Sequence, residues 1–533
     1  MTMVSLILIP IIFGVILYKV PIKIGKVILM FIQSYLSVTA ISLLVKSRTA
    51  GTITEVLGGD NPILYISLRA DNIALAFVCL TIFLFTTTFI YTLKGEYFDN
   101  RFMLLFLVLQ GLLTGIFLTD DLFNLFVLME VSTVIVTILI MYKKDNRRVI
   151  YDGLYYLIIQ IISMMFFLFG IAYIYKIFGV LSLAEISNLM AIGVPKETLI
   201  LPFSFLMTGL CLKIGFFPLF SWVSRAYGTP STPFAVLAIL SGLVAKSSLF
   251  QFIRLNRLFY PTLDYTNFFL VLAILTGIIG FMKALAQKDI KLILAYSTIS
   301  QIGLIIIGSL MLDEKAYWGS MYHIINHSLF KALLFLTTGI ITEVYGTRNV
   351  HKIRGVFKRM PVVAGATILA ILGITGAPFF NGAVSKYWIL EGSSGTIFEA
   401  IIWIINTGTI LVFVKYGAIL FGTSEAKEKK STDIFRTSVI WLLGIVCLLG
   451  GIFGPQVVHF LFGVELSINM LDFMSKGLIY IAMLLGAHYF YRYVLMKTNL
   501  LYRFAEGSLT LPQNCLVLLI FFMTLISYGI FLA

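Results

Sequence analysis

Residues 122–141 read LFNLFVLMEVSTVIVTILIM, and Glu130 is the only charged residue among them. About twenty apolar residues suffice for a helix to cross a lipid bilayer. A charge at the bilayer centre costs roughly 2.5–3.5 kcal/mol on insertion scales, so charges are rare there and usually functional. Lys213, Lys246 and Lys386 lie inside later apolar segments in the same way. Buried charges of opposite sign indicate translocation of protons or cations.

The composition is that of a polytopic membrane protein. Of 533 residues, 59% are hydrophobic and 12% are charged, which excludes the soluble globular classes. The net charge of +14 does not indicate nucleic acid, because the basic residues flank apolar spans instead of forming a block. The four cysteines show no metal-like spacing, and no haem, iron–sulfur or nucleotide motif occurs. We therefore expect no cofactor and no metal in this chain.

Windows of about 19 residues predict sixteen transmembrane helices in an all-α fold. They lie near 3–19, 25–45, 73–93, 101–119, 122–141, 153–177, 199–220, 234–252, 266–283, 291–312, 317–343, 361–393, 398–421, 436–454, 477–496 and 513–532. Whether residues 455–476 form an interfacial helix stays open. The first span lacks a basic n-region and a cleavage site, which favours a retained helix over a signal peptide.

Loop charges predict the orientation. The odd-numbered loops carry about 25 Lys and Arg and the even-numbered loops about 8, an asymmetry that follows the positive-inside rule. It places the N-terminus outside and, with sixteen helices, the C-terminus as well. The expected location is the cell inner or plasma membrane, with many passes.

Two of the predicted spans contain a break. The seventh ends in Lys213-Ile-Gly-Phe-Phe-Pro218, and the twelfth contains Gly373-Ile-Thr-Gly-Ala-Pro378-Phe-Phe-Asn-Gly382 before Lys386. Proline removes a backbone donor, and backbone freed at membrane depth must be buried in protein or line a cavity. A lysine beside a break in each half is typical of inverted repeats. The alternative is that the prolines only kink packed helices.

We accordingly predict two inverted five-helix repeats, helices 4–8 in residues 101–253 and helices 9–13 in residues 266–421. Helices 1–3 in residues 1–100 precede them, and the C-terminal helices in residues 436–533 follow.

Glu130 and Lys213 have complementary charges. Asp120 and Asp121 are suited to capping the helix, but Glu130 lies more than two turns deeper, where capping cannot explain it. Opposite charges about 4 Å apart interact by roughly 4 kcal/mol at an effective dielectric of 20. A displacement of a few Å would therefore change how firmly Lys213 holds its proton, so the pair could work as a switch. A structural ion pair, or a protonated glutamic acid between helices, is the alternative.

Further ionisable residues follow along the chain. Lys246 lies among small residues that leave room for water, although a lysine extending to the interface is a second interpretation. His323, His327 and Lys331 are spaced i, i+4 and i+8, on one helical face. Histidine suits a proton relay because its ordinary pKa is about 6.5. Structural hydrogen bonding is the alternative, and metal binding lacks a third ligand. Lys415 is a weaker candidate of the same type.

Several of these segments together resemble a known family. The matching segments are Thr119–Glu130, Lys213–Pro218 with Trp222, Lys246, Gln287–Gly303, His323–Lys331 and Gly376–Lys386. They are similar to the antiporter-like membrane subunits of respiratory complex I, Mrp-type sodium/proton antiporters and membrane-bound energy-converting hydrogenases, over roughly residues 60–425.

The resemblance implies a fourteen-helix core with about two extra C-terminal helices here. It also implies a switchable Glu130–Lys213 pair, and a hydrated axis through Lys246 and His323 or His327 to Lys386. The family's Trp-Leu-Pro-x-Ala-His motif is Trp222-Val-Ser-Arg-Ala-Tyr227 here, which questions that loop's role in proton coupling. The connection 497–512 is too short for the long lateral helix of the distal complex I subunits, which favours a more internal or Mrp-like subunit.

The leading hypothesis is an ion-translocating subunit, moving protons or also sodium, within a larger complex. Moving one charge against about 100 mV costs roughly 2.3 kcal/mol, which partners would supply by redox chemistry or counter-flowing ions. The expected partners are other membrane subunits, homologous antiporter-like and small ones among them, within the lipid bilayer. The alternatives are a stand-alone secondary antiporter and a redox subunit that binds quinone or haem.

Overall fold

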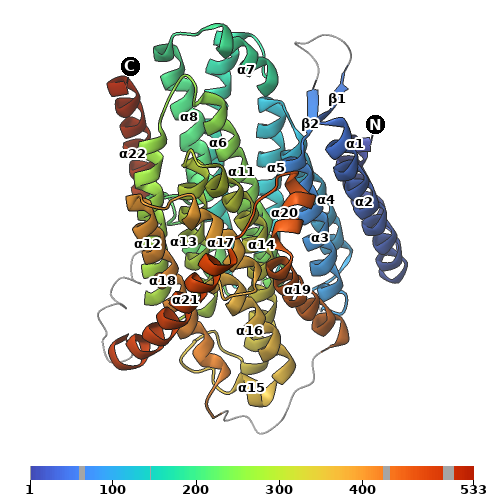
Figure 1. The fold of residues 1–533 in the computed structure, drawn as a ribbon. Coiled ribbons are helices and arrows are strands. Elements are labelled where there is room, and N and C mark those ends of the chain that lie inside the picture. Colours follow the sequence, from blue (N-terminus) through green and yellow to red (C-terminus); the bar gives the residue numbers. More distant parts are fainter. Residues whose placement is uncertain are drawn as a thin grey trace.

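The computed structural model describes residues 2–58, 66–95, 97–143, 146–423, 433–495 and 509–532. Most helices run side by side in one bundle (Figure 1). The helices before the first break are α1 (Thr2–Leu17), α2 (Ile22–Ala50), α3 (Asn72–Thr92), α4 (Asn100–Leu118), α5 (Leu122–Ile140), α6 (Arg147–Phe178), α7 (Leu183–Ile192) and α8 (Lys196–Ile214). A short hairpin of β1 (Ile53–Leu57) and β2 (Ile66–Ala70) follows α2, with Ile53 opposite Ala70.

The chain continues after the first break with α9 (Val223–Gly228), α10 (Phe234–Ile239), the π-helix η1 (Leu240–Val244), α11 (Ala245–Phe259), α12 (Thr266–Ala286), α13 (Ile290–Leu310), α14 (Glu314–Tyr345), α15 (Val356–Arg359) and α16 (Pro361–Thr375). Beyond the second break are α17 (Asn381–Glu391), α18 (Ile397–Gly417), the 3₁₀ turn η2 (Ala418–Leu420), α19 (Ile434–Ile452), α20 (Gly454–Phe462), α21 (Met470–Phe490), the π-helix η3 (Tyr491–Leu495) and α22 (Leu511–Leu532).

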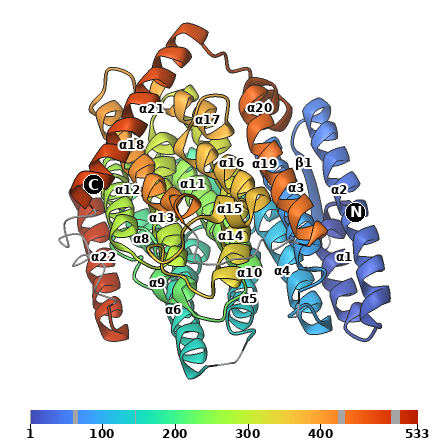
Figure 2. The same ribbon diagram turned by 90° about the horizontal axis from the view of Figure 1, so that it is seen from below.

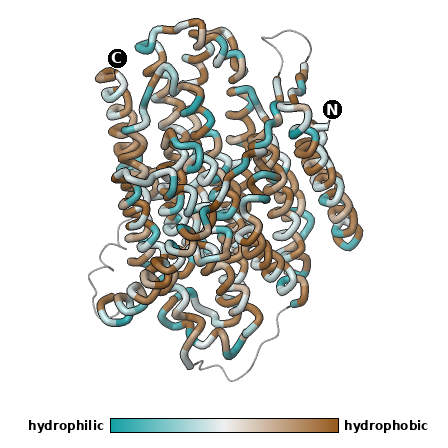
Figure 3. Tube along the Cα trace, viewed as in Figure 1, coloured by the Kyte–Doolittle hydropathy of each residue, from teal (hydrophilic) through white to brown (hydrophobic). Residues whose placement is uncertain are grey.

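The predicted membrane architecture is confirmed. In the described part of the chain, 14 helices are long and apolar enough to cross a membrane. The shorter apolar helix α1 and the broken pair α16–α17 account for the other two predicted spans. The span predicted at 122–141, for example, is α5, Leu122–Ile140. Apolar residues dominate along the helices in Figure 3. The chain is therefore a multi-pass membrane protein.

Both predicted breaks are present and have the same local structure. α8 and α16 each end at a glycine in the left-handed conformation, Gly215 with φ 78° and Gly376 with φ 82°. In each case the next amide, of Phe216 or Ala377, donates back to a carbonyl five residues earlier at 2.9 Å. This C-cap satisfies carbonyls that the helix end leaves free. The same ending in both halves supports the predicted repeats, while the domain limits at 253 and 266 stay predictions.

Three features were not anticipated from apolar runs, and one question that the sequence left open is answered. The connection predicted at 46–72 contains the last turn of α2 and the β1–β2 hairpin, and α7 lies in the connection before α8. Within the open segment 455–476, α20 is helical. The span predicted at 477–496 is α21, which crosses α17 and α18 obliquely in Figure 1. The short connection predicted at 497–512 falls largely on residues outside those described.

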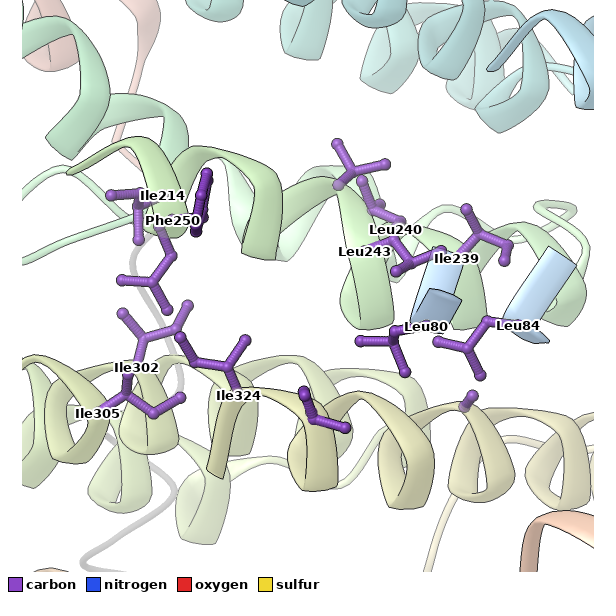
Figure 4. Close-up of a cluster of buried hydrophobic side chains, with 14 of the residues drawn as sticks. Leu80, Leu84, Ile214, Ile239, Leu240, Leu243, Phe250, Ile302, Ile305 and Ile324 are labelled. Atoms are coloured by element: carbon purple, nitrogen blue, oxygen red, sulfur yellow. The ribbon is translucent and has the colours of Figure 1, made fainter. Parts of the chain in front are cut away.

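A π-helical turn interrupts the helix that carries Lys246. η1 lies between α10 and α11, and its Leu240 and Leu243 are near Leu80 and Leu84 of α3 in Figure 4. A π turn widens the helix by one residue and is frequent at functional sites. Here the turn ends just before Lys246, within a fully buried apolar layer.

The helices α12 and α13 pack closely where Gly303 of α13 meets Gly277 of α12. A Cβ built on Gly303 would lie 2.4 Å from the Gly277 backbone nitrogen, a distance that real Cβ atoms do not adopt. Small residues at such crossings allow helices in membranes to approach closely. The α12–α13 crossing therefore depends on glycine at 303.

We predict that Gly303→Val destabilises the protein, because overpacking a helix contact costs about 1–3 kcal/mol and the obstacle here is backbone. The control is Gly486→Val on α21, where nothing lies within 4 Å of the added Cβ. Thermal melting in detergent should show a lower midpoint for Gly303→Val and an unchanged one for Gly486→Val. Equal midpoints for the two variants would contradict the packing described.

Candidate functional site

Glu130 and Lys213 approach each other without a direct contact. Asp121 caps α5 by accepting from Asn124 N at 2.6 Å, while Asp120 pairs with Arg254 at 2.5 Å, so only one of the two aspartates caps the helix. Glu130 is half-buried, and its Oε2 has no hydrogen-bond partner among the described residues. The described ion pairs do not include one between Glu130 and Lys213.

Lys213 instead forms a hydrogen bond with Thr133, which lies about one turn beyond Glu130 on α5. It lies in the last turn of α8, and its Nζ donates to Thr133 Oγ1 at 2.6 Å and to Met129 O at 3.4 Å. Thr133 follows Glu130 by three residues, so it lies on nearly the same face of α5. Glu130 is still close enough for an electrostatic interaction with Lys213. The Lys213 ammonium therefore has an uncharged partner on α5, and Glu130 lies within electrostatic range of it.

Lys246 lies wholly inside the protein. It is 0% exposed, and its Nζ has no hydrogen-bond partner among the described residues. Its fully enclosed ammonium does not support the interpretation as a lysine extending to the interface. A buried polar group without a partner costs roughly 1–3 kcal/mol, and more when charged. Burying Lys246 without a partner therefore lowers the stability of the fold, so stability does not explain why a lysine occupies this position.

His323, His327 and Lys331 share one buried face of α14, as their spacing predicted. All three are 0% exposed, and the rings of His323 and His327 are 6.3 Å apart between centroids. The Lys331 Nζ donates to Ser297 Oγ at 2.5 Å and to Leu294 O at 2.8 Å, both on α13. Neither ring nitrogen of His327 has a partner among the described residues. Lys331 is thus anchored, whereas His327 resembles Lys246 in being buried and unpaired.

The hydrogen bonds of His323 suit both of its protonation states. Its Nε2 lies 3.0 Å from Gln301 Oε1, an acceptor, so Nε2 carries the proton in neutral histidine. Its Nδ1 lies 2.8 Å from Ser385 Oγ, which can donate to it. The same hydroxyl also reaches Asn381 O at 3.2 Å. When Nδ1 gains a proton, a rotation of the Ser385 hydroxyl toward Asn381 O lets Ser385 accept instead.

Lys386 follows Ser385 directly and lies against the broken helix. It is 4% exposed, and its Nζ donates to Ile374 O at 2.9 Å, near the end of α16. A helix C-terminus carries partial negative charge and favours a cation. His323 thus bonds to Ser385 on α17, the residue that precedes Lys386.

The helices that carry these residues lie close together in the bundle. In the view along the bundle, α14 lies between α5 and α17 (Figure 2). Electrostatic interactions link Lys246 and Lys386 to both histidines. The structure thus gathers the predicted residues of the second half, with Lys246, into one buried polar group. Glu130 and Lys213 lie on α5 and α8, where they interact electrostatically with each other and Lys213 bonds to α5.

The sequence interpretation missed two buried polar residues, of which Gln301 belongs to this group. Gln301 links His323 to Thr409, with its Nε2 donating to Thr409 Oγ1 at 2.9 Å. The sequence did contain a signal for Gln301, because a glutamine in the middle of an apolar span is unusual. Lys291 is buried too, with its Nζ against Thr229 O at 3.2 Å and Thr232 O at 3.1 Å. Its place at the start of a span concealed it.

Other candidates have structural roles. The Lys415 Nζ donates to Leu285 O at 2.6 Å and Gln287 O at 2.5 Å, which caps the end of α12. Trp222 donates to Leu212 O at 2.9 Å and packs on Tyr156, and so braces the first break. Tyr227 is 2% exposed and packs on Phe335. Within the described chain, His, Cys, Asp and Glu side chains form no group of three that could hold a metal.

The relatives found among known proteins are subunits of an NADH-quinone oxidoreductase and of Na(+)/H(+) antiporters. The chain is 29% identical over 471 residues to NADH-quinone oxidoreductase subunit N of Desulforudis audaxviator (strain MP104C), covering 80% of this chain and 92% of that one. It is 33% identical over 291 residues to an Na(+)/H(+) antiporter subunit of Alkalihalophilus pseudofirmus (strain ATCC BAA-2126 / JCM 17055 / OF4), covering 54% of this chain and 57% of that one.

Solved structures share the fold. A chain of the membrane-bound sulfane sulfur reductase, an archaeal respiratory membrane complex, matches with a TM-score of 0.79 and 22% identity, covering 91% of this chain and 98% of that one. A chain of the Mrp complex from Dietzia sp. DQ12-45-1b matches with a TM-score of 0.77 and 20% identity, covering 95% and 99%.

A family model covers more than half of the chain and includes every predicted site residue. It is described as NADH:quinone oxidoreductase/Mrp antiporter, TM, and it matches residues 119–412. The site residues from Glu130 to Lys386 all fall within this range. The chain therefore belongs to the transmembrane NADH:quinone oxidoreductase/Mrp antiporter family.

Proposed function

We propose that this chain is the proton-translocating, antiporter-like subunit of a multisubunit membrane complex. The observation that carries the proposal is the buried group formed by Lys246, His323, His327, Lys331 and Lys386. Five proton-binding side chains, each at most 4% exposed, lie together inside the membrane part of the protein. Structural roles alone would not require so many.

The type of side chain favours protons over sodium. Amines and imidazoles bind and release protons, whereas hard cations select oxygen ligands. Protonated lysines in this group would repel a second cation, and a proton can pass between nitrogen atoms without entering as an ion. Sodium, if it moves, would need another route or another subunit.

We propose that Glu130 and Lys213, in the first half of the chain, form a switch. Lys213 can leave Thr133 for Glu130 by moving about one turn, or roughly 5 Å, along α5. At about 4 Å and an effective dielectric of 20 the closed pair gains roughly 4 kcal/mol, enough to change the proton affinity of both groups by orders of magnitude. Opening and closing the pair would then alter the charge that Lys246 and the histidines experience.

The surface around Glu130 favours a partner subunit. Val127 and Val131 are 39% and 41% exposed on the same outward part of α5, and Glu130 between them is half-buried. A carboxylate facing lipid is costly at this depth. We infer that another membrane subunit covers this face and provides a hydrogen-bond donor or a base. The energy for uphill transport, roughly 2.3 kcal/mol per charge at 100 mV, would come from such partners.

The named relatives are consistent with this assignment. They are a subunit of NADH-quinone oxidoreductase and subunits of Na(+)/H(+) antiporters, and the shared fold occurs in two multisubunit complexes. For this chain we propose the plasma or inner membrane, with the N-terminus outside as the loop charges indicate.

We predict that Lys213→Ala and Glu130→Ala each abolish proton translocation while the complex still assembles. A positioned proton-transfer group contributes about 10²- to 10⁴-fold, so the remaining rate should be about a hundredth or less. The test measures proton uptake into vesicles that contain the intact complex. The controls are Lys358→Ala and Glu197→Ala, which remove the same charges from exposed positions. Wild-type rates in assembled Lys213→Ala would reject the proposed function.

We also predict that Ser385→Ala slows translocation by about five- to tenfold, because His323 loses the hydroxyl that serves both protonation states. The matched control is Ser328→Ala on α14, whose hydroxyl bonds only its own helix, at Ile324 O, 2.8 Å away. The same vesicle assay compares the two variants. Equal rates would show that Ser385 is not part of the relay.

A further inference from the structure

Gln160 on α6 is a buried amide without a hydrogen-bond partner. It is 1% exposed, and neither its Nε2 nor its Oε1 bonds to any of the described residues. The buried amides of Gln33 and Gln110, by contrast, bond each other twice, at 2.6 and 2.9 Å. A buried polar group without a partner lowers the stability of a protein. Gln160 therefore occupies a position where an apolar residue would be more stable.

The helix α6 lies between the two helices that carry Glu130 and Lys213. It packs against both α5 and α8, and Figures 1 and 2 show it between them. A Cβ built on Gly209 of α8 would lie 2.7 Å from Ser163 O, and a Cβ built on Gly170 would lie 2.9 Å from the Leu206 nitrogen. Later residues of α6 thus meet earlier residues of α8, so these two helices run in opposite directions.

The contact between Ser163 and Gly209 places Gln160 level with Lys213. Gln160 precedes Ser163 by three residues, and Lys213 follows Gly209 by four. These steps are about 4.5 and 6 Å in the same direction along the two antiparallel helices. Residues three or four apart also share a helix face. Gln160 therefore lies on the side of α6 that faces α8, at nearly the height of Lys213.

A second contact relates Gln160 to α5. A Cβ built on Gly153 would meet the Cγ of Met141, the residue that follows the last turn of α5. The two helices are consecutive and run in opposite directions. Gln160 lies seven residues beyond Gly153, about 10.5 Å, and Thr133 lies eight residues before Met141, about 12 Å. Gln160 is thus level with the threonine that holds Lys213 as well.

Glu130 lies on the same contact between α5 and α6. It precedes Met141 by eleven residues, which turns it only about 20° away from the direction of Met141. Gln160 is turned by the same small angle from Gly153. Tyr156, one turn before Gln160, interacts electrostatically with Glu130. Gln160 therefore lies on the face of α6 that is turned toward Glu130.

The three side chains have matching unused hydrogen-bonding groups. The Lys213 ammonium has three donors, and its bonds to Thr133 Oγ1 and Met129 O use two of them. Glu130 Oε2 accepts from none of the described residues. The Gln160 amide carries an acceptor for the ammonium and two donors for the carboxylate. A single amide can therefore bond both members of the pair at once.

We propose that Gln160 is a positioning residue of the Glu130–Lys213 switch, whose Oε1 accepts from Lys213 and whose Nε2 donates to Glu130 while the two charges are apart. The proposal rests on the proposed function. The amide is neutral and neither gains nor loses a proton, so it stabilises the separated charges without replacing either of them. An apolar residue here would leave the closed pair as the favoured state, and a carboxylate would hold the lysine in its charged form.

The first test replaces Gln160 by methionine, which is unbranched, similar in length and without the amide. Loss of a hydrogen bond to a charged group predicts proton uptake that is about ten- to hundredfold slower in vesicles containing the intact complex. The melting midpoint in detergent should stay the same or rise, because Gln160→Met removes a buried group without a partner. Wild-type uptake in Gln160→Met would overturn the proposal.

The matched control is Gln33→Met, which removes an equally buried but paired amide from α2. It leaves Gln110 unpaired, so the melting midpoint should fall while proton uptake per assembled complex stays unchanged. A purely structural role for Gln160 predicts the same result for Gln160→Met. A fall of the midpoint as large as that of Gln33→Met would therefore also overturn the proposal.

Two further variants at the same position test the need for a neutral amide. Gln160→Asn keeps the amide on a shorter side chain and should be at least about threefold faster than Gln160→Met, since it retains part of the bonding. Gln160→Glu keeps the length and the acceptor but adds a charge that competes with Glu130 for Lys213, so it should be as slow as Gln160→Met. Equal rates for the asparagine and methionine variants, or wild-type uptake in Gln160→Glu, would contradict the proposed role.

Lys213→Ala separates this proposal from the proposed function. If Lys213→Ala is inactive while Gln160→Met transports at the wild-type rate, only the role of Gln160 fails. If assembled Lys213→Ala is active, the proposed function fails instead.

Discussion

The structure depends on one constraint, which is the need to satisfy buried cations in a medium without bulk water. Backbone carbonyls freed at helix ends and breaks meet this need for several of them, as Ile374 O does for Lys386 and Leu285 O for Lys415. Lys213 uses a threonine hydroxyl, and Lys331 a serine. Lys246 and His327 have no such partner among the described residues. The fold thus gives most of its buried cations a hydrogen-bond acceptor and leaves these two side chains without one in the described chain.

The two helix breaks and the π turn lie close to buried lysines. The carbonyls of a continuous helix already accept bonds within the helix, so a helix end offers a lysine inside the membrane a more available acceptor. The end of α16 at a left-handed glycine leaves Ile374 O available to Lys386, whereas Lys213 at the end of α8 bonds to Thr133 of α5. The π turn η1 changes the register just before Lys246. Local irregularities of the backbone thus occur where the ionisable side chains are.

Much of this organisation was predictable from sequence, because apolar length and charge are local properties. The spans, the two breaks and the shared face of His323, His327 and Lys331 followed from such patterns. Side-chain partners did not, because they depend on which helices meet. The preference of Lys213 for Thr133 over Glu130, the hydrogen bond between His323 and Ser385, and the oblique course of α21 are of this kind. Lys291 was missed because its position at a span end resembles that of an interfacial lysine.

The proposed proton path requires water at the side chains of Lys246 and His327, which have no partner among the described residues. The direct measurement is a cryo-electron-microscopy map of the intact complex at a resolution that shows ordered water. The account predicts water density within hydrogen-bonding distance of Lys246 Nζ and of both His327 ring nitrogens, continuing toward Lys386. A dry interior, with these atoms enclosed by apolar side chains alone, would contradict it.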